Sequence, residues 1–185
     1  MNLSEFYKST GENSDKGTVH CYIDEWYSNE FTPIRNEELS ILEIGVNKGD
    51  SIILWRDWFI NSKIVGIDNK GEMTDEDINI VNNIENVNII YGDAYSDEVV
   101  NLYTNETFDY IIDDGPHTLE SQLNCVKKWL PKLKSNGKLI IEDVMDIDKA
   151  KIHFDNLGIP YELIDLRSKS KHNQINDVLL VFKIK

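Results

Sequence analysis

The stretch that decides the fold is SILEIGVNKGD, residues 40–50. It begins with a short apolar run typical of a buried β-strand and passes through Gly45 and Gly49. After Asp50, apolar residues recur at helical spacing as far as Phe59. A strand, a glycine turn and a helix in this order indicate the first unit of a sheet whose strands are joined by helices.

The same alternation continues along the rest of the chain. Strands are expected at residues 40–45, 63–68, 86–91, 108–113, 138–143, 161–167 and 177–183. Helices are expected after Asp50, at 74–83, after Ser96, at 118–130 and at 148–157. This pattern predicts an α/β, Rossmann-like, doubly wound fold with a mostly parallel seven-stranded sheet, helices on both faces and an antiparallel C-terminal strand.

Residues 1–39 lack this rhythm, and they are polar with scattered aromatic side chains. We expect a segment that covers another part of the molecule, with a short helix over 19–27 capped by Ser14 or Asp15 and stopped at Thr32-Pro33. The prediction is one domain over residues 1–185, in which the covering segment precedes a core at 40–185.

The net charge of the chain restricts the classes of partner that it is expected to bind. It has 33 acidic and 19 basic residues, a formal net charge of −14. Such a surface repels nucleic acid and anionic membranes, so neither is expected as a partner. No apolar run reaches the roughly 20 residues of a membrane span, the first residues do not resemble a signal peptide, and Cys21 and Cys125 lack metal-ligand spacing. We expect a cytoplasmic protein with reduced thiols, and homo-oligomerisation stays open.

Two predicted strands end in acidic residues. IIDDGPH (111–117) brings Asp113, Asp114 and His117 after one strand, and LIIED (139–143) brings Glu142 and Asp143 after the next. Unpaired carboxylates are costly to bury, so we expect them at the carboxyl edge of the sheet around a cation. Carboxylates suit Mg²⁺, Mn²⁺ or Ca²⁺ rather than zinc. A helix N-cap with solvated acids is the alternative interpretation.

The first glycine turn indicates a nucleoside site. The spacing Gly-x-x-x-Gly is neither a dinucleotide fingerprint nor a phosphate loop. Asp68 ends the second strand, where it is placed to accept hydrogen bonds from ribose hydroxyls, and Asp93 follows the third strand, where it suits an adenine amino group. The alternative is that the glycines only shape a turn and that Asp68 is a surface acid.

Together these features resemble class I S-adenosylmethionine-dependent methyltransferases over residues 40–143. Their Glu-x-Gly-x-x-x-Gly turn, second-strand acid and Gly-Asp-Ala step match Glu43 to Gly49, Asp68 and 92–94. The resemblance implies S-adenosylmethionine as cofactor. The cofactor-binding residues that it implies are Glu43, Gly45, Val46, Asn47, Gly49, Ser51, Asp68, Asn69, Gly92, Asp93, Ala94 and Asp113.

The motif at 113–117 is similar to the Asp-Asp-Gly-Ser-His element of the macrocin and mycinamicin sugar O-methyltransferases, with Pro116 in place of serine. That likeness implies Mg²⁺ held by Asp114, Glu142 and Asp143, with His117 as general base and Asp114 in the catalytic set. Residues 15–18, with His20, Tyr22 and Tyr27, also resemble the lead-in segment of these enzymes. The implied reaction is O-methylation of a small-molecule hydroxyl on a sugar or polyol.

Three alternatives stay open from the residues alone. A catechol-type O-methyltransferase would chelate the same metal through vicinal oxygens. A non-catalytic S-adenosylmethionine-binding module would keep the nucleoside site, and Pro116 is the feature that favours it. A nucleotide-dependent oxidoreductase is disfavoured by the glycine spacing. The identity of the acceptor is not encoded in any motif.

Overall fold

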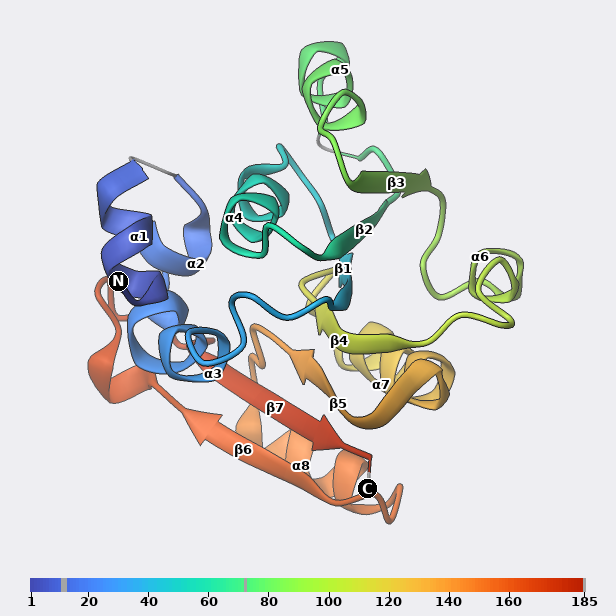
Figure 1. The fold of residues 1–185 in the computed structure, drawn as a ribbon. Helices are drawn as coiled ribbons and strands as arrows, with labels where there is room; N and C mark the ends of the chain where they lie inside the picture. The colour runs from blue at the N-terminus through green and yellow to red at the C-terminus, as the bar shows by residue number, and fades with distance from the viewer. Residues whose placement is uncertain (11–12, 72, 185) are drawn as a thin grey trace.

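A seven-stranded sheet forms the centre of the computed structural model, which describes residues 1–10, 13–71 and 73–184 (Figure 1). The strands are β1 (Ser40–Ile44), β2 (Lys63–Asp68), β3 (Val87–Tyr91), β4 (Phe108–Asp113), β5 (Leu133–Ile141), β6 (Tyr161–Asp165) and β7 (Val178–Lys183). Their order is β3-β2-β1-β4-β5-β7-β6. The first five strands pair in parallel, and β7 runs antiparallel to both β5 and β6. The predicted fold class is confirmed.

The strand order reverses between β1 and β4, which pair directly. The carboxyl ends of β1 to β5 lie at one edge of the sheet, because these strands are parallel. In open α/β sheets, ligands bind outside this edge at the point of reversal. The fold therefore brings the acids that end β1, β2, β4 and β5 to the same rim.

Helices cover both faces of the sheet. They are α1 (Leu3–Thr10), α2 (Asp15–Thr18), the π-helix η1 (Ile23–Tyr27), α3 (Ser28–Phe31), α4 (Asp50–Trp58), α5 (Asp75–Asn82), α6 (Asp97–Asn101), α7 (Leu119–Trp129), the 3₁₀-helix η2 (Leu130–Lys132), α8 (Ile147–Asp155) and the 3₁₀-helix η3 (Arg167–Lys169). Figure 1 shows α4 and the N-terminal helices on one side of the sheet, with α6 and α7 on the other.

Two apolar layers follow from the alternation of side chains along each strand. In β1, Ile41 faces the layer that contains Trp55 of α4, whereas Leu42 faces the layer that contains Trp129 of α7. Both tryptophans are fully buried. The sheet is therefore apolar on both faces, and its polar chemistry is confined to the edges.

The N-terminal segment is more regular than the sequence indicates. The expectation of an irregular stretch is wrong, because α1, α2, η1 and α3 lie within the described residues between Leu3 and Phe31, whereas the expected short helix over 19–27 overlaps η1. Ser14 precedes α2 but makes no side-chain cap hydrogen bond. The expected stop at Thr32-Pro33 agrees with the end of α3. Leu3, Tyr27 and Phe31 are fully buried in the apolar layer that also contains Trp55 of α4 and Ile41 of β1.

The remaining differences concern element ends. β5 begins at Leu133 rather than Lys138, directly after η2, whose second residue is Pro131. A register shift between Phe108 and Tyr110 accommodates the longer strand beside β4. Within the described residues, no helix has the length and apolar character required to cross a bilayer.

A stability prediction arises from Asp24 in η1, which ties α1 to the rest of the segment. Its Oδ1 accepts hydrogen bonds from Ser4 Oγ at 2.5 Å and Lys8 Nζ at 2.8 Å, and Lys171 Nζ lies 3.0 Å from Oδ2. Burial raises the pKa of Asp24, but these partners outweigh it and lower the pKa to about 2. We expect Asp24→Asn to reduce the free energy of unfolding by about 1 kcal/mol at neutral pH.

The pH dependence of that loss follows from the lowered pKa. The ionised Asp24 stabilises the folded chain fully above its unfolded pKa of about 4, and this contribution disappears as the pH falls through about 2. Urea unfolding of both proteins across this range measures it. A difference between wild type and Asp24→Asn that does not shrink on acidification would contradict the assignment.

Candidate active site

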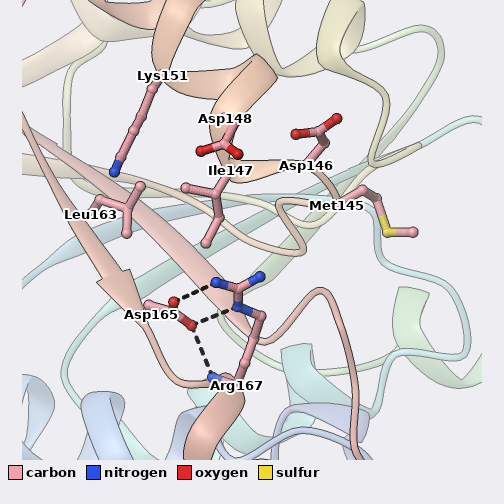
Figure 2. Close-up of a pocket in the computed structure, with 8 residues that line it drawn as sticks. All are labelled: Met145, Asp146, Ile147, Asp148, Lys151, Leu163, Asp165 and Arg167. Carbon is pink, nitrogen blue, oxygen red and sulfur yellow. Dashed lines mark hydrogen bonds and ion pairs between the residues drawn. The ribbon is translucent and has the colours of Figure 1, made fainter.

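A cleft of about 410 Å³ opens at the carboxyl edge between α8 and β6 (Figure 2). Its polar lining consists of Asp146, Asp148, Lys151, Asp165 and Arg167, and its apolar lining of Met145, Ile147 and Leu163. The Arg167 guanidinium donates to both carboxylate oxygens of Asp165, at 2.8 and 2.7 Å. None of the predicted cofactor or metal residues lines this cleft, although it begins two residues beyond Asp143.

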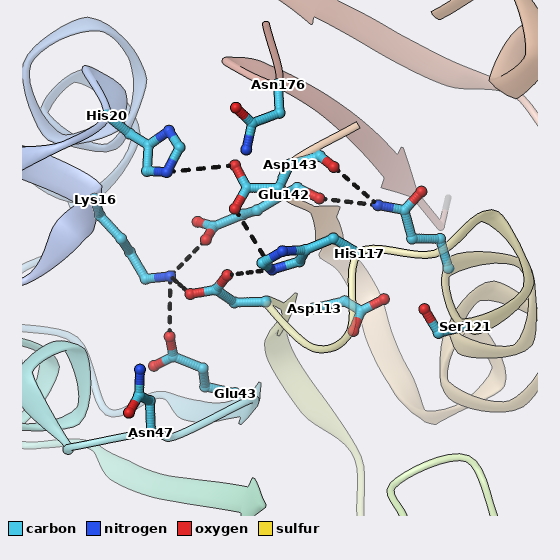
Figure 3. Close-up of polar contacts among 12 residues, drawn as sticks. Lys16, His20, Glu43, Asn47, Asp113, His117, Ser121, Glu142, Asp143 and Asn176 are labelled. Carbon is cyan, nitrogen blue, oxygen red and sulfur yellow. Dashed lines mark hydrogen bonds and ion pairs between the residues drawn. The ribbon is translucent and has the colours of Figure 1, made fainter. Parts of the chain in front are cut away.

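The predicted metal residues lie where β4 and β5 end (Figure 3). Asp114, His117 and Asp143 each place a ligand atom within 4.8 Å of the others. His117 Nε2 lies 3.0 Å from Asp114 Oδ1 and 3.4 Å from Asp143 Oδ2. The fold thus brings together three of the residues that the sequence assigned to this site, and Glu142 is not part of this group.

A left-handed backbone conformation orients two of these side chains. His117 and Asp143 have φ of +55° and +56°, the left-handed region that costs a non-glycine residue about 1–2 kcal/mol. Such strain persists where the surrounding structure fixes it, and it concentrates at functional sites. Gln122 of α7 supports the turn after β5, since its Nε2 donates to the Glu142 carbonyl at 3.1 Å. The N-cap of α7 is Thr118, so the alternative that Asp113 and Asp114 cap this helix is wrong.

The N-terminal segment reaches Asp143 from the opposite side. The Tyr22 hydroxyl donates to Asp143 Oδ1 at 2.7 Å. His20 stacks on Tyr22 with ring centroids 4.9 Å apart, and its Nδ1 lies 2.5 Å from Oδ1 of the fully buried Asp177. Its Nε2 is 3.6 Å from Asp143 Oδ1. A chain of polar contacts therefore runs from Asp177, just before β7, through His20 to the acid cluster.

Lys16 of α2 supplies the cation that these acids contact in the structure. Its side chain is 1% exposed, and its Nζ lies 2.5 Å from Asp114 Oδ2, 2.5 Å from Glu142 Oε2 and 3.2 Å from Glu43 Oε1 (Figure 3). Glu142 is also bound by the Tyr27 hydroxyl at Oε1. Glu142, one of the three predicted metal ligands, is thus held by protein groups at both carboxylate oxygens.

The electrostatics reflect a shortage of positive charge. Burial opposes the charged form of Lys16, yet the neighbouring carboxylates raise the pKa of its ammonium well above the usual value. The pKa of Asp114 is lowered to about 2, because Lys16 and His117 outweigh the opposing effect of burial. Burial and the Asp114 charge raise the pKa of Glu142 and Asp143. Glu43, Asp114 and Glu142 share the single ammonium of Lys16, and Asp143 lies beside them at His117, so carboxyl groups outnumber lysine ammonium groups at this edge.

His117 stands between these charges. Burial lowers the pKa of its imidazole, but the hydrogen bond and charge of Asp114 and the charge of Asp143 raise it, and the net pKa is above the ordinary value. Its side chain is 35% exposed, so solvent or a ligand can reach it. The residue is therefore both accessible and basic, as a proton acceptor must be.

The predicted cofactor turn is closely packed. Gly45 and Gly49 both adopt φ of +88°. A Cβ on Gly45 would lie 2.0 Å from the Asp114 carbonyl oxygen, and one on Gly49 would lie 2.6 Å from a methyl of Val81. The close approach of these protein atoms thus explains why both positions are glycine. Glu43 is fully buried, with Oε2 accepting from Trp55 Nε1 at 2.8 Å.

Asp68 supports the same turn from β2. Its Oδ2 accepts backbone hydrogen bonds from Val46 at 2.8 Å and Asn47 at 2.9 Å, and its Oδ1 accepts one from Lys70 at 2.6 Å. The carboxylate remains half-buried at the rim, and Oδ1 keeps a lone pair for a further donor. It therefore shapes the turn and keeps one acceptor position for a ligand.

The other predicted cofactor residues divide by exposure. Asn47, Asn69 and Asp93 are exposed along the carboxyl edge and Gly92 is half-buried, whereas Val46, Ser51, Ala94 and Asp113 are buried. Asp113 accepts a hydrogen bond from the Tyr95 hydroxyl at 2.6 Å, and burial raises its pKa to about 6. Acids and amides at the ends of β1, β2 and β3 thus form a rim whose acceptors fit the hydroxyl and amino groups of a nucleoside.

Several residues of the site carried no role in the sequence interpretation. They are Lys16, Tyr95, Gln122 and Asp177, and they touch the acid cluster directly or through one neighbour. The only available signal for Lys16 was its place in the lead-in segment at residues 15–18, since its partners are 98 and 126 positions away.

Comparison with known proteins agrees with this geometry. The profile of a family described as a methyltransferase domain matches residues 42–144. The chain is 27% identical over 169 residues to demethylmacrocin O-methyltransferase of Streptomyces fradiae, covering 80% of this chain and 40% of that protein. The identity and coverage are the same for mycinamicin VI 2''-O-methyltransferase of Micromonospora griseorubida. The predicted resemblance is confirmed, and the chain spans about 40% of the length of these relatives.

Solved structures share the fold. MycE methyltransferase from the mycinamycin biosynthetic pathway, in complex with Mg and SAH, superposes with a TM-score of 0.70 at 20% identity, covering 100% of this chain and 55% of that one. A putative caffeoyl-CoA O-methyltransferase from Staphylococcus aureus gives 0.62 at 20% identity, covering 99% and 90%. At these identities the likeness establishes the arrangement of strands and helices.

Proposed function

Because this chain belongs to the methyltransferase domain family, we propose that it transfers a methyl group from S-adenosylmethionine to a hydroxyl oxygen of a sugar-like small molecule, assisted by Mg²⁺. The observation that carries the proposal is the convergence of Asp114, His117 and Asp143 at the carboxyl ends of β4 and β5. The names of the relatives support the choice of acceptor, because they specify O-methylation of demethylmacrocin, of mycinamicin VI and of a rhamnosyl tetracenomycin.

The charge of the edge fits both proposed ligands. Four carboxyl groups surround one ammonium, and a divalent cation and a sulfonium would offset this excess of acidic groups. Oxygen ligands from Asp114 and Asp143 are those that Mg²⁺ prefers. The rim of Asn47, Asp68 and Asp93 lies on the β1 to β3 side of this cluster, where a nucleoside would extend.

In the proposed reaction His117 removes the proton of the acceptor hydroxyl at Nδ1, because Nε2 already donates to the Asp114 carboxylate. An alcohol is a weak nucleophile at neutral pH, and a bound divalent cation would orient and acidify it. Asp114 holds His117 by the contact to Nε2, and its charge stabilises the imidazolium once the proton has moved. The remaining acceleration comes from positioning, which the strained His117 and Asp143 backbones and the Gln122 contact provide.

The cleft between α8 and β6 supports a sugar-like acceptor (Figure 2). Both β5 and β6 run antiparallel to β7, so their carboxyl ends lie at the same edge. Asp146 and Asp148 offer carboxylates to hydroxyl groups, and Ile147 and Leu163 offer apolar surface to the C–H face of a ring. We propose that the acceptor extends from His117 towards this cleft.

Removal of the metal tests the activity. With S-adenosylmethionine and a panel of demethylmacrocin, a rhamnosyl glycoside and catechol, we expect methyl transfer to a glycoside that EDTA abolishes and added Mg²⁺ restores. Mass spectrometry of the acceptor measures the product, and calorimetry measures cofactor binding. Methylation that persists in EDTA would refute the metal-assisted mechanism. If catechol is the one acceptor that is methylated, the acceptor is a phenol and not a sugar. If the cofactor binds but no acceptor of the panel is methylated, the chain is a binding module.

A further inference from the structure

Tyr22 of the lead-in segment contacts Asp143 at two points. Its hydroxyl donates to Asp143 Oδ1 at 2.7 Å, and the Asp143 backbone N–H donates to the hydroxyl oxygen at 3.4 Å. The Asn176 carbonyl oxygen lies 2.9 Å from the same hydroxyl, but a hydroxyl has a single hydrogen, and a bond to a carboxylate is the stronger of the two. The hydrogen of the Tyr22 hydroxyl is therefore assigned to Asp143.

The helix that follows Tyr22 explains how this segment reaches two neighbouring acids. η1 begins directly after Tyr22, ends at Tyr27 and is a π-helix, whose hydrogen bonds join residues five apart. In an α-helix, in contrast, residues three or four apart share a face. Tyr22 contacts Asp143, and Tyr27, five residues further on, contacts Glu142. The π-helix thus sets two hydroxyls against consecutive residues of the turn after β5.

The sheet fixes Tyr22 through His20. The Tyr22 side chain is fully buried, and it stacks on the His20 ring with an interplanar angle of 5°. His20 Nδ1 lies 2.5 Å from Oδ1 of Asp177, a fully buried residue just before β7. His20 Nε2 is 3.6 Å from Asp143 Oδ1, which is beyond hydrogen-bond length. The direct hydrogen bond to Asp143 therefore comes from Tyr22, and His20 holds Tyr22 in place.

The orientation of Asp143 depends on this bond. Within the described residues, no other side chain makes a hydrogen bond of ordinary length to the Asp143 carboxylate. Figure 3 shows one oxygen of this carboxylate facing His20 and the other facing His117. With Oδ1 held by Tyr22, Oδ2 lies 3.4 Å from His117 Nε2. Without the hydroxyl, the carboxylate is free to rotate and to leave His117.

We propose that Tyr22 is a positioning residue for methyl transfer, whose hydroxyl holds the Asp143 carboxylate in the orientation that faces His117. Asp114 and Asp143 flank His117 Nε2, at 3.0 and 3.4 Å, so the direction of each carboxylate affects where the imidazole directs Nδ1. The lead-in segment thus sets the geometry of the proton acceptor. This inference rests on the proposed function, since it assumes that His117 removes the acceptor proton.

The experiment removes the hydroxyl and keeps the ring. We expect Tyr22→Phe to lower kcat for methyl transfer by about 10-fold or more, the loss usual when a partner that orients a site carboxylate is removed, and to leave the KM for S-adenosylmethionine unchanged. Tyr110→Phe is the matched control, because the Tyr110 hydroxyl also donates to a carboxylate at 2.7 Å, that of Glu30 in α3. Both variants should unfold at lower urea concentration, but kcat of Tyr110→Phe should stay at the wild-type value.

A spectroscopic readout follows the same orientation without turnover. The ¹⁵N resonance of His117 Nε2 is recorded at constant pH without cofactor or metal, and it is assigned by its absence in His117→Gln. We expect this resonance to move in Tyr22→Phe and to stay in place in Tyr110→Phe. In an Asp143→Asn background, Tyr22→Phe should not move it further, because the charge that Tyr22 orients is gone. Circular dichroism establishes that each variant is folded.

The outcomes separate this inference from the function on which it rests. A wild-type chain that methylates no acceptor, but whose His117 resonance responds to Tyr22→Phe through Asp143, refutes the proposed function and supports the orientation of Asp143 by Tyr22. Equal kcat values in Tyr22→Phe and Tyr110→Phe overturn the inference alone, as does a raised KM for S-adenosylmethionine without a fall in kcat. A change in the resonance that persists in the Asp143→Asn background also overturns it, because Tyr22 would then act by another route.

Discussion

Replacement of His117 by glutamine is expected to lower kcat for methyl transfer by about 10² to 10⁴-fold, the contribution usual for a general base. Glutamine keeps a polar side chain of similar reach but cannot accept a proton at neutral pH. The effect should fall on kcat, because His117 lies on the β4–β5 side of the edge, away from the nucleoside rim of β1 to β3. Cofactor affinity, measured by calorimetry, should therefore survive the substitution.

His153→Gln provides the matched control for this prediction. His153 lies in α8 with its side chain exposed, and we assign it no role in the site. The same chemical change at this position should leave kcat at the wild-type value. If His117→Gln turns over as fast as His153→Gln, proton removal by His117 is excluded, and the cation alone must activate the acceptor.

The fold could be predicted because its signals are local. Ile111 and Ile112 lie in one predicted strand and point to opposite apolar layers, and this continuous apolar run is typical of a strand covered on both faces. The turn at Gly45 and the acids that follow β4 and β5 then place the site at the carboxyl edge. Each of these inferences needs only neighbouring residues and the rules of parallel sheets.

The partners of each acid could not be predicted in the same way. Glu43 and Asp68 were expected to face a cofactor. In the structure, Glu43 contacts Trp55 and Lys16, and Asp68 accepts hydrogen bonds from backbone amides of the turn. A carboxylate accepts hydrogen bonds from whichever donor the fold brings near. Lys16 lies in α2, a helix of only four residues, which is too short to show a helical sequence pattern. Contacts across more than 90 positions leave no mark in local sequence.

The second large effect is expected for Gly45→Ala, which should reduce the free energy of unfolding by about 2–5 kcal/mol. Alanine at the φ of +88° costs about 1–2 kcal/mol in backbone strain alone. A Cβ there would also lie 2.0 Å from the Asp114 carbonyl oxygen, an overlap that forces the β1 and β4 turns apart, and overpacking of this kind typically costs about 1–3 kcal/mol more. Urea unfolding, followed by circular dichroism, measures the loss.

Gly158→Ala separates the two contributions. Gly158 also has a positive φ, +66°, but a Cβ there would meet nothing within 4 Å. Its loss of stability should therefore be the strain alone, about 1–2 kcal/mol. Equal losses in the two variants would mean that the turn after β1 moves to accommodate the Cβ without a further loss of stability. Unequal losses, with weaker Mn²⁺ binding in Gly45→Ala only, would show that this glycine positions Asp114 by allowing the two turns to meet.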